Sequence, residues 1–118
     1  MAILLGKRQV QGQSIPLSQT GDDPTELFAI PEDACWPAHV SVDNTHATAN
    51  VYLKWVQNGS KGTLSSSDFS RRLKAGDGYV WDAPPRNSRL IGIADTPGVT
   101  LKIDANWSYL YADVLEAQ

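Results

Sequence analysis

The chain has one cysteine, no block of like charges and no long hydrophobic run. Because Cys35 is alone among 118 residues, an intrachain disulfide is impossible and a disulfide-dense secreted mini-domain is excluded. The formal net charge is −3 and no basic footprint is present, so we expect no nucleic-acid partner. No stretch approaches the roughly 20 apolar residues that span a bilayer, so no membrane partner is expected. The start, MAILLGKR, is too short in apolar residues for the core of a signal peptide.

The chain also lacks a pattern of reactive side chains. His39 and His46 could meet across a hairpin with Cys35 nearby, but the paired spacing of a zinc site is missing. No G-x-S-x-G elbow accompanies the serines at 65–67, and the apolar setting of Cys35 is typical of a buried small hydrophobe. The aspartates lie among turn residues, and their spacing selects no catalytic pair. We therefore predict no catalytic residue, no metal and no cofactor, and we expect that the protein is not an enzyme.

Short strands separated by turn signals make up most of the chain. The run from Val40 to Val56, VSVDNTHATANVYLKWV, alternates apolar and polar residues on both sides of Asn44-Thr45, and 90–105 has a similar texture. No convincing amphipathic helix is present. Strands are expected over 3–10, 26–30, 39–43, 50–57, 69–73, 79–81, 90–94, 99–103 and 107–114. This pattern predicts an all-β fold, an antiparallel β-sandwich of jelly-roll or Greek-key type.

Two dipeptides make specific turn predictions. Asn58-Gly59 follows the strand 50–57 and predicts a type I′ hairpin turn, in which both residues take positive φ. Pro97-Gly98 predicts a type II turn between 90–94 and 99–103, with positive φ at Gly98. Two adjacent prolines at 84–85 remove two ladder donors and predict an extended break.

The first 23 residues differ from the rest of the chain. The stretch 9–23 is polar, contains four glutamines and Pro16, and has little hydrophobic patterning. We interpret 1–23 as an extended N-terminal arm or edge strand, and 24–118 as the β-sandwich domain. Deleting 1–19 is expected to leave the sandwich folded and to weaken attachment to a partner. The candidate partner-binding residues are Leu4, Leu5, Lys7, Arg8, Ile15 and Leu17.

Aromatic residues are plentiful, with four tryptophans and four tyrosines. In the last expected strand Trp107, Tyr109 and Tyr111 share one face, where they could form an exposed platform for a sugar. The alternative is that the aromatic rings fill the core or seal a subunit contact, two settings in which aromatic side chains dominate the energetics. The opposite face of this strand is also apolar, so we expect both faces to be covered.

Three segments resemble small β-rich structural proteins of tailed bacteriophages. They are VSVDNTHATANVYLKWV from Val40, FSRRLKAGDGYVWDAPP from Phe69 and RLIGIADTPGVTLKI from Arg89. The similar features are an asparagine-threonine turn, a valine-tyrosine-leucine run, a leucine-x-alanine-glycine turn and an isoleucine-alanine-aspartate hairpin. The resemblance covers a little over half of the chain and leaves the first 30 residues uncovered.

This resemblance implies a virion component, made in the host cytoplasm, of the capsid decoration (cement) type on the outer shell. The implied partner is the major capsid protein, and a closed homo-oligomer, a trimer or dimer, is expected at a capsid symmetry axis. The N-terminal arm could add a strand to an adjacent protein, with many weak contacts reinforced by the effective concentration in the lattice. The alternative function is a carbohydrate- or receptor-binding module of a phage tail or fibre.

Overall fold

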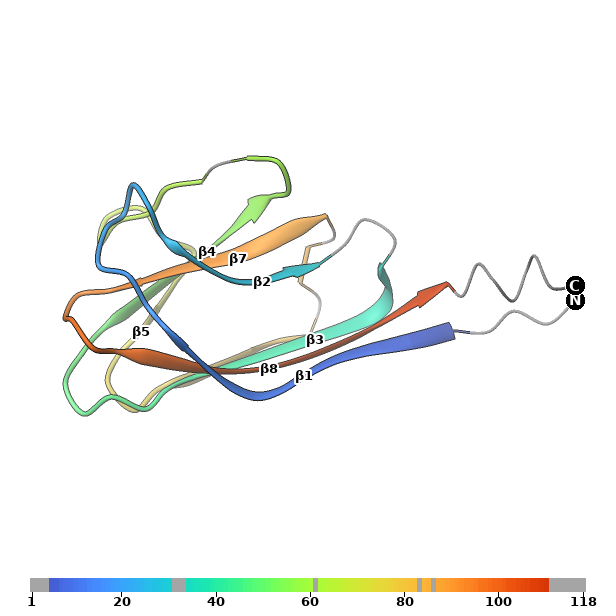
Figure 1. Ribbon diagram of the computed structural model, residues 1–118, viewed down its shortest axis with the longest axis horizontal. Helices are drawn as coiled ribbons and strands as arrows, with labels where there is room; N and C mark the ends of the chain where they lie inside the picture. Colours follow the sequence, from blue (N-terminus) through green and yellow to red (C-terminus); the bar gives the residue numbers. More distant parts are fainter. Residues whose placement is uncertain (1–4, 31–33, 61, 83, 86, 111–118) are drawn as a thin grey trace, which may run out of the picture.

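A computed structural model describes residues 5–30, 34–60, 62–82, 84–85 and 87–110 of the chain. In this part of the chain, two four-stranded sheets have the strand orders β1-β8-β3-β6 (sheet A) and β2-β7-β4-β5 (sheet B). Figure 1 shows the two sheets facing each other, which confirms the predicted all-β sandwich. The strands are β1 (Leu5–Pro16), β2 (Thr25–Ile30), β3 (Ala34–Asn44), β4 (Val51–Gln57), β5 (Arg71–Leu73), β6 (Gly78–Trp81), β7 (Ser88–Ala94) and β8 (Thr100–Leu110).

The strand order is that of a jelly roll. One long two-stranded ribbon runs through the antiparallel pairs β1–β8, β2–β7, β3–β6 and β4–β5, and the β4–β5 connection forms its closed end. Wrapping this ribbon around the core adds the pairs β3–β8 and β4–β7 and completes the two sheets. Eight strands arranged in this way are the jelly-roll architecture, one of the two topologies expected from the sequence.

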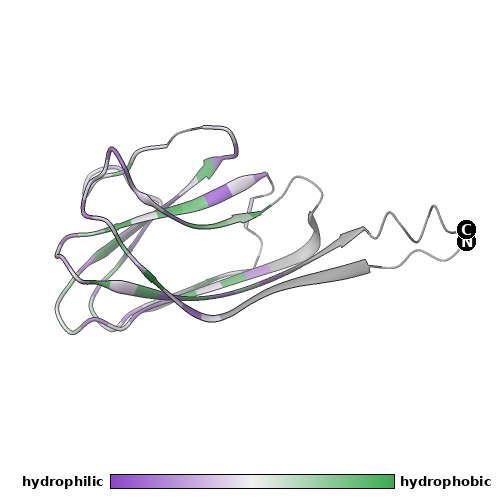
Figure 2. Ribbon diagram, viewed as in Figure 1, coloured by the Kyte–Doolittle hydropathy of each residue, from purple (hydrophilic) through white to green (hydrophobic). Residues whose placement is uncertain are grey.

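The core between the sheets comes from alternate residues of the inner strands. Many apolar side chains that point inward are completely buried, and each of these contributes about 1.5–3 kcal/mol relative to full exposure. Figure 2 shows the corresponding hydrophobic segments on both sheets. The fully buried examples on β3, β4 and β8 are Val40, Val42, Val51, Leu53, Leu101 and Ile103.

β7 is buried on both faces. Leu90 and Ala94 belong to the core between the sheets, whereas Ile91 and Ile93 form a second cluster with Leu64 on the outer face of sheet B. Leu64 comes from the long connection between β4 and β5, which folds back over this face. The part of the outer face of sheet B around Ile91 and Ile93 is therefore covered by the chain's own loop.

The two turn predictions have different outcomes. Gly98 has a φ of 78°, as predicted, but β7 and β8 lie in different sheets, so this turn leads the chain across the sandwich. The type I′ prediction is wrong, because Gly59 has a φ of 88° while Asn58 does not take positive φ. The Ser60 N–H donates to the Gln57 carbonyl at 3.0 Å, and positive φ at the third position is typical of a type II turn. This turn opens the long β4–β5 connection instead of a tight hairpin.

Strand boundaries differ from the prediction at both ends of the chain. β1 runs to Pro16, beyond the strand expected over 3–10, so much of the polar stretch expected as an arm or edge strand is the edge strand of sheet A, paired with β8. The strand expected at 99–103 and the described part, 107–110, of the strand expected at 107–114 belong to one continuous strand, β8. Ala105 is buried between the less buried Asp104 and Asn106, so these polar residues continue the strand alternation instead of interrupting it.

A bulge at Gly12 bends β1 without ending its pairing. The register with β8 shifts between Val10 and Gln13, and Gly12 has a φ of 56°. Its N–H donates to Asp104 Oδ1 at 2.6 Å, which satisfies a donor that the ladder has lost. Positive φ suits glycine, so the backbone itself explains the residue at this position.

Candidate functional surfaces

The predicted absence of a metal site concerns His39, His46 and Cys35. His39 and Asn44, where β3 ends, are about 16 Å apart at a strand rise of about 3.3 Å per residue, and His46 lies beyond Asn44. The structure therefore does not bring the two histidines together. In the described residues no group of three His, Cys, Asp or Glu could hold a metal ion, and the side chain of Cys35 is outside them. His39 Nδ1 instead lies 3.5 Å from Asp82 Oδ1 on an exposed surface.

Asn44 is the buried polar centre of the β3–β4 connection. Its side chain is 1% exposed, and Nδ2 lies 2.8, 3.3 and 3.1 Å from the carbonyl oxygens of Ala49, Leu73 and Lys74. Its Oδ1 accepts the N–H of His46 at 3.2 Å. One side chain thus joins the β3–β4 connection to the end of β5. The alternation of Val40, Val42 and Asn44 could have indicated this inward position, although we interpreted Asn44 only as a turn residue.

The six candidate partner-binding residues do not form one exposed patch. Leu17 is 8% exposed and belongs to the core cluster, against which Ile15 packs, so both side chains serve the core of this chain. The backbones of Leu5, Lys7 and Arg8 pair with β8. The side chains of these three residues, and all of Leu4, lie outside the described part.

The proposed aromatic platform lies outside the described side chains. The backbones of Trp107 and Tyr109 continue β8 and pair with β1, and Tyr111 lies beyond the described residues. Other aromatic rings pack against the core: the ring centres of Trp55 and Trp81 are 5.6 Å apart with an interplanar angle of 87°. For these two tryptophans the core interpretation is correct.

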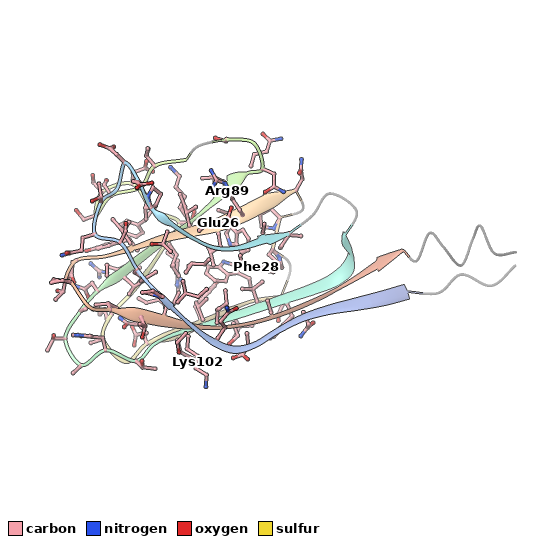
Figure 3. All side chains as sticks on the ribbon, in the orientation of Figure 1. Glu26, Phe28, Arg89 and Lys102 are labelled. Carbon is pink, nitrogen blue, oxygen red and sulfur yellow. The ribbon has the colours of Figure 1, made fainter. Side chains whose placement is uncertain are left out.

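A shallow polar hollow of about 440 Å³ lies at the edge of sheet B. Arg89 Nη1 is 3.4 Å from Glu26 Oε1, and Nη2 donates to the carbonyl oxygen of Ser60. Figure 3 shows Glu26 and Arg89 close together, while Phe28 lies between the sheets and Lys102 points away from sheet A. The guanidinium is therefore already paired within the chain. The hollow is lined by Glu26, Asn58, Gly59, Ser60 and Arg89.

A second hollow of about 290 Å³ lies over the outer face of sheet B. Asp95 at its rim accepts hydrogen bonds from the backbone N–H and Nδ2 of Asn50 at 3.0 and 3.1 Å, and from Thr96 Oγ1 at 3.0 Å. Desolvation by burial raises the pKa of Asp95, but these hydrogen bonds lower it by more. The pKa of Asp95 is therefore below its ordinary value. The lining residues are Gln19, Gly21, Tyr52, Leu64, Ser65, Ser66, Ile93, Ala94 and Asp95.

The longest exposed edge of the described sheets belongs to β1. This strand has 12 residues, whereas the edge strands β2, β5 and β6 have 6, 3 and 4. Short strands protect a sheet edge against pairing with other chains, and a long edge leaves a row of free backbone groups. Figure 1 shows β1 and β8 continuing past the end of sheet B. The β1–β8 extension is joined by the start of β3, where Ala34 and Cys35 pair with β8.

No protein-family model matches this chain, and no curated protein matches it. Within the part of the chain that the structure describes, no helix is long and apolar enough to cross a membrane.

Proposed function

We propose that this chain is a non-enzymatic structural component of a tailed-phage virion, a capsid decoration protein that bridges neighbouring subunits on the capsid surface. The proposed partner is the major capsid protein, and the proposed state is a closed trimer or dimer. The observation that carries the proposal is the β1 edge, which extends past sheet B and offers free backbone groups. Jelly rolls occur in viral capsid proteins but also in lectins, so the fold alone does not assign this function.

The backbone groups available for pairing follow from the ladder. In an antiparallel ladder, alternate residues of a strand bond to the same neighbour. Because the Leu17 N–H donates to the Val99 carbonyl at 2.9 Å, the odd-numbered residues of β8 are those that bond to β1. In the register, Arg8 and Val10 lie opposite odd-numbered residues, so their N–H and C=O groups bond to β8. The N–H and C=O groups of Lys7 and Gln9 therefore point outward, away from the sheet. An added strand would be held by these main-chain bonds.

The sequence of β1 favours a different protein over a second copy of β1 as the added strand. Lys7 and Arg8 are adjacent and positively charged. Like charges opposite each other destabilise a strand pair, whereas an acidic segment of a partner would be attracted. Each contact can be weak, because binding at several places on a lattice multiplies the effect of a single site.

Capsids that lack this protein provide the test. The purified chain should co-sediment with them to a fixed stoichiometry and raise the temperature at which they release DNA. Gln9→Pro removes an outward N–H and should reduce binding, while Gln9→Ala keeps that N–H and serves as the matched control. Absence of association, together with unchanged heat resistance of the capsids, would reject the proposal.

The alternative function, a carbohydrate- or receptor-binding module of a tail or fibre, is tested on the same sample. Tryptophan fluorescence is titrated with host polysaccharide, because a ring stacked on a sugar must change its emission. A saturable response without capsid association would favour this alternative. Sedimentation analysis of the free protein separates the proposed trimer or dimer from a monomer.

A further inference from the structure

We propose that the hollow over the outer face of sheet B binds a neutral saccharide. This site is separate from the β1 edge, and the inference does not rest on the virion proposal. It is argued from how the hollow is built, from the rings at its floor and from the charge of its rim.

The hollow is assembled from strands β4 and β7 and from two connections that are bonded to each other and to β7. Tyr52 on β4 and Ile93 on β7 lie at its floor, on the outer face of sheet B. The Leu64 N–H donates to the Gly21 carbonyl at 3.1 Å and joins the β4–β5 connection to the β1–β2 connection. The Ala94 N–H donates to the Ser18 carbonyl at 3.0 Å and anchors the β1–β2 connection to β7. A site whose walls are already bonded loses little conformational entropy when a ligand enters.

Two aromatic rings lie at the hollow and beside it. The ring centre of Tyr52 is 5.3 Å from that of Phe69, with an interplanar angle of 55°. Phe69, which is 38% exposed, does not line the hollow but packs beside Tyr52, so its ring is open to a ligand that extends over Tyr52. A saccharide has C–H faces that pack on aromatic rings and hydroxyl groups that need hydrogen-bond partners. Tyr52 supplies both kinds of contact through its ring and its hydroxyl.

The polar groups at the rim suit hydroxyl groups better than ions. The exposed side chains of Gln19 and Ser66 can both donate and accept hydrogen bonds. Among the described lining residues, Asp95 is the one charged group, so an anionic ligand would be repelled. Two bonds to its Oδ1 and one to its Oδ2 leave roughly one acceptor position of the carboxylate free for a hydroxyl.

The test is an NMR titration of the isolated protein with glucose, galactose and N-acetylglucosamine, each raised to about 50 mM, because simple sugars in shallow sites bind in the millimolar range. The amide signals of Tyr52, Ser66 and Ala94 should shift and saturate with at least one sugar. Phe69→Ala should weaken binding about threefold to tenfold. The matched control is Val80→Ala, which removes the 46% exposed Val80 of sheet A and should leave the affinity unchanged.

Three results would overturn the inference. One is that none of the sugars shifts these amides, and another is that neither Phe69→Ala nor Gln19→Ala changes the affinity. The third is that galacturonate binds more tightly than galactose, because a preferred anion contradicts the charge of the rim. Capsid association is measured separately, so failure of the saccharide site and failure of the virion proposal give different results.

Discussion

Replacing Asn44 tests whether the jelly roll depends on one buried amide. Nδ2 carries two hydrogens, so one serves the Ala49 carbonyl and the other is shared by the carbonyls of Leu73 and Lys74. Asn44→Ala removes both donors, and it also removes the acceptor of the His46 N–H. Each buried group left without a partner costs about 1–3 kcal/mol, so we expect a loss of roughly 3 kcal/mol in the free energy of unfolding.

Asn44→Asp should be worse than Asn44→Ala although it keeps the shape of the side chain. The new oxygen would face two or three carbonyl oxygens with no hydrogen to donate, and a buried unpaired carboxylate costs about 3–5 kcal/mol. Burial raises the pKa of the introduced carboxyl above its unfolded value of about 3.9. The variant should therefore be most stable below that pH and lose stability as the pH rises through the folded-state pKa.

Urea unfolding followed by tryptophan fluorescence measures both variants. Asn106→Ala, at an exposed position of β8, is the matched control and should change the free energy of unfolding by less than about 0.5 kcal/mol. If Asn44→Ala costs less than about 1 kcal/mol, or if Asn44→Asp is as stable as the original protein at neutral pH, the reasoning from the buried network is refuted.

Three further predictions use the same unfolding assay. Leu17→Ala should lower the free energy of unfolding by about 2–4 kcal/mol, because Leu17 belongs to the core. A loss under about 1 kcal/mol would show that Leu17 lies in a peripheral arm and not in the core. Gly92→Ala should cost about 1–3 kcal/mol, since its Cβ would lie 2.9 Å from Leu53 Cδ2 inside the core; a neutral effect would contradict this packing. Asp95 has a lowered pKa, so its contribution is present above its ordinary pKa of 3.8 and is lost as the pH falls through the folded value. Asp95→Ala should flatten this acid limb, and an unchanged pH profile would argue against the hydrogen bonds from Asn50.

The structure also changes the expectation for a truncated chain. Deleting 1–19 would remove β1, whose pairing with β8 runs from Leu5–Leu110 to Pro16–Thr100, and would remove Leu17 from the core. We now expect the truncated chain to be strongly destabilised. The sequence predicted a strand over 3–10 and left 1–23 as an arm or edge strand, because an edge strand is held largely by main-chain bonds, which leave little trace in its side chains.

The positions of the candidate surfaces could not be predicted from the sequence. Tyr52 on β4, Ser66 in the β4–β5 connection and Ala94 on β7 meet at one hollow because β4 pairs with β7 and the connection folds over them, and nothing in the local sequence of any of the three indicates the others. The sequence predicted an arm or edge strand within 1–23, but only the sheet order β1-β8-β3-β6 shows that the outer edge of β1 pairs with no described strand. The sequence directed attention to Trp107 and Tyr109, which lie on the β8 backbone but whose side chains are outside the described part.

Properties set by a few neighbouring residues followed from the sequence alone. The alternation of Val40 with Val42 and of Val51 with Leu53 determined which side chains are buried, and Pro97-Gly98 determined a positive φ at Gly98. The tertiary structure decided which strands pair, that β7 and β8 lie in different sheets, and that Asn58-Gly59 opens a long connection. The physical reason is that backbone angles and side-chain alternation are local, whereas ladder partners are chosen by how the whole ribbon buries its apolar face.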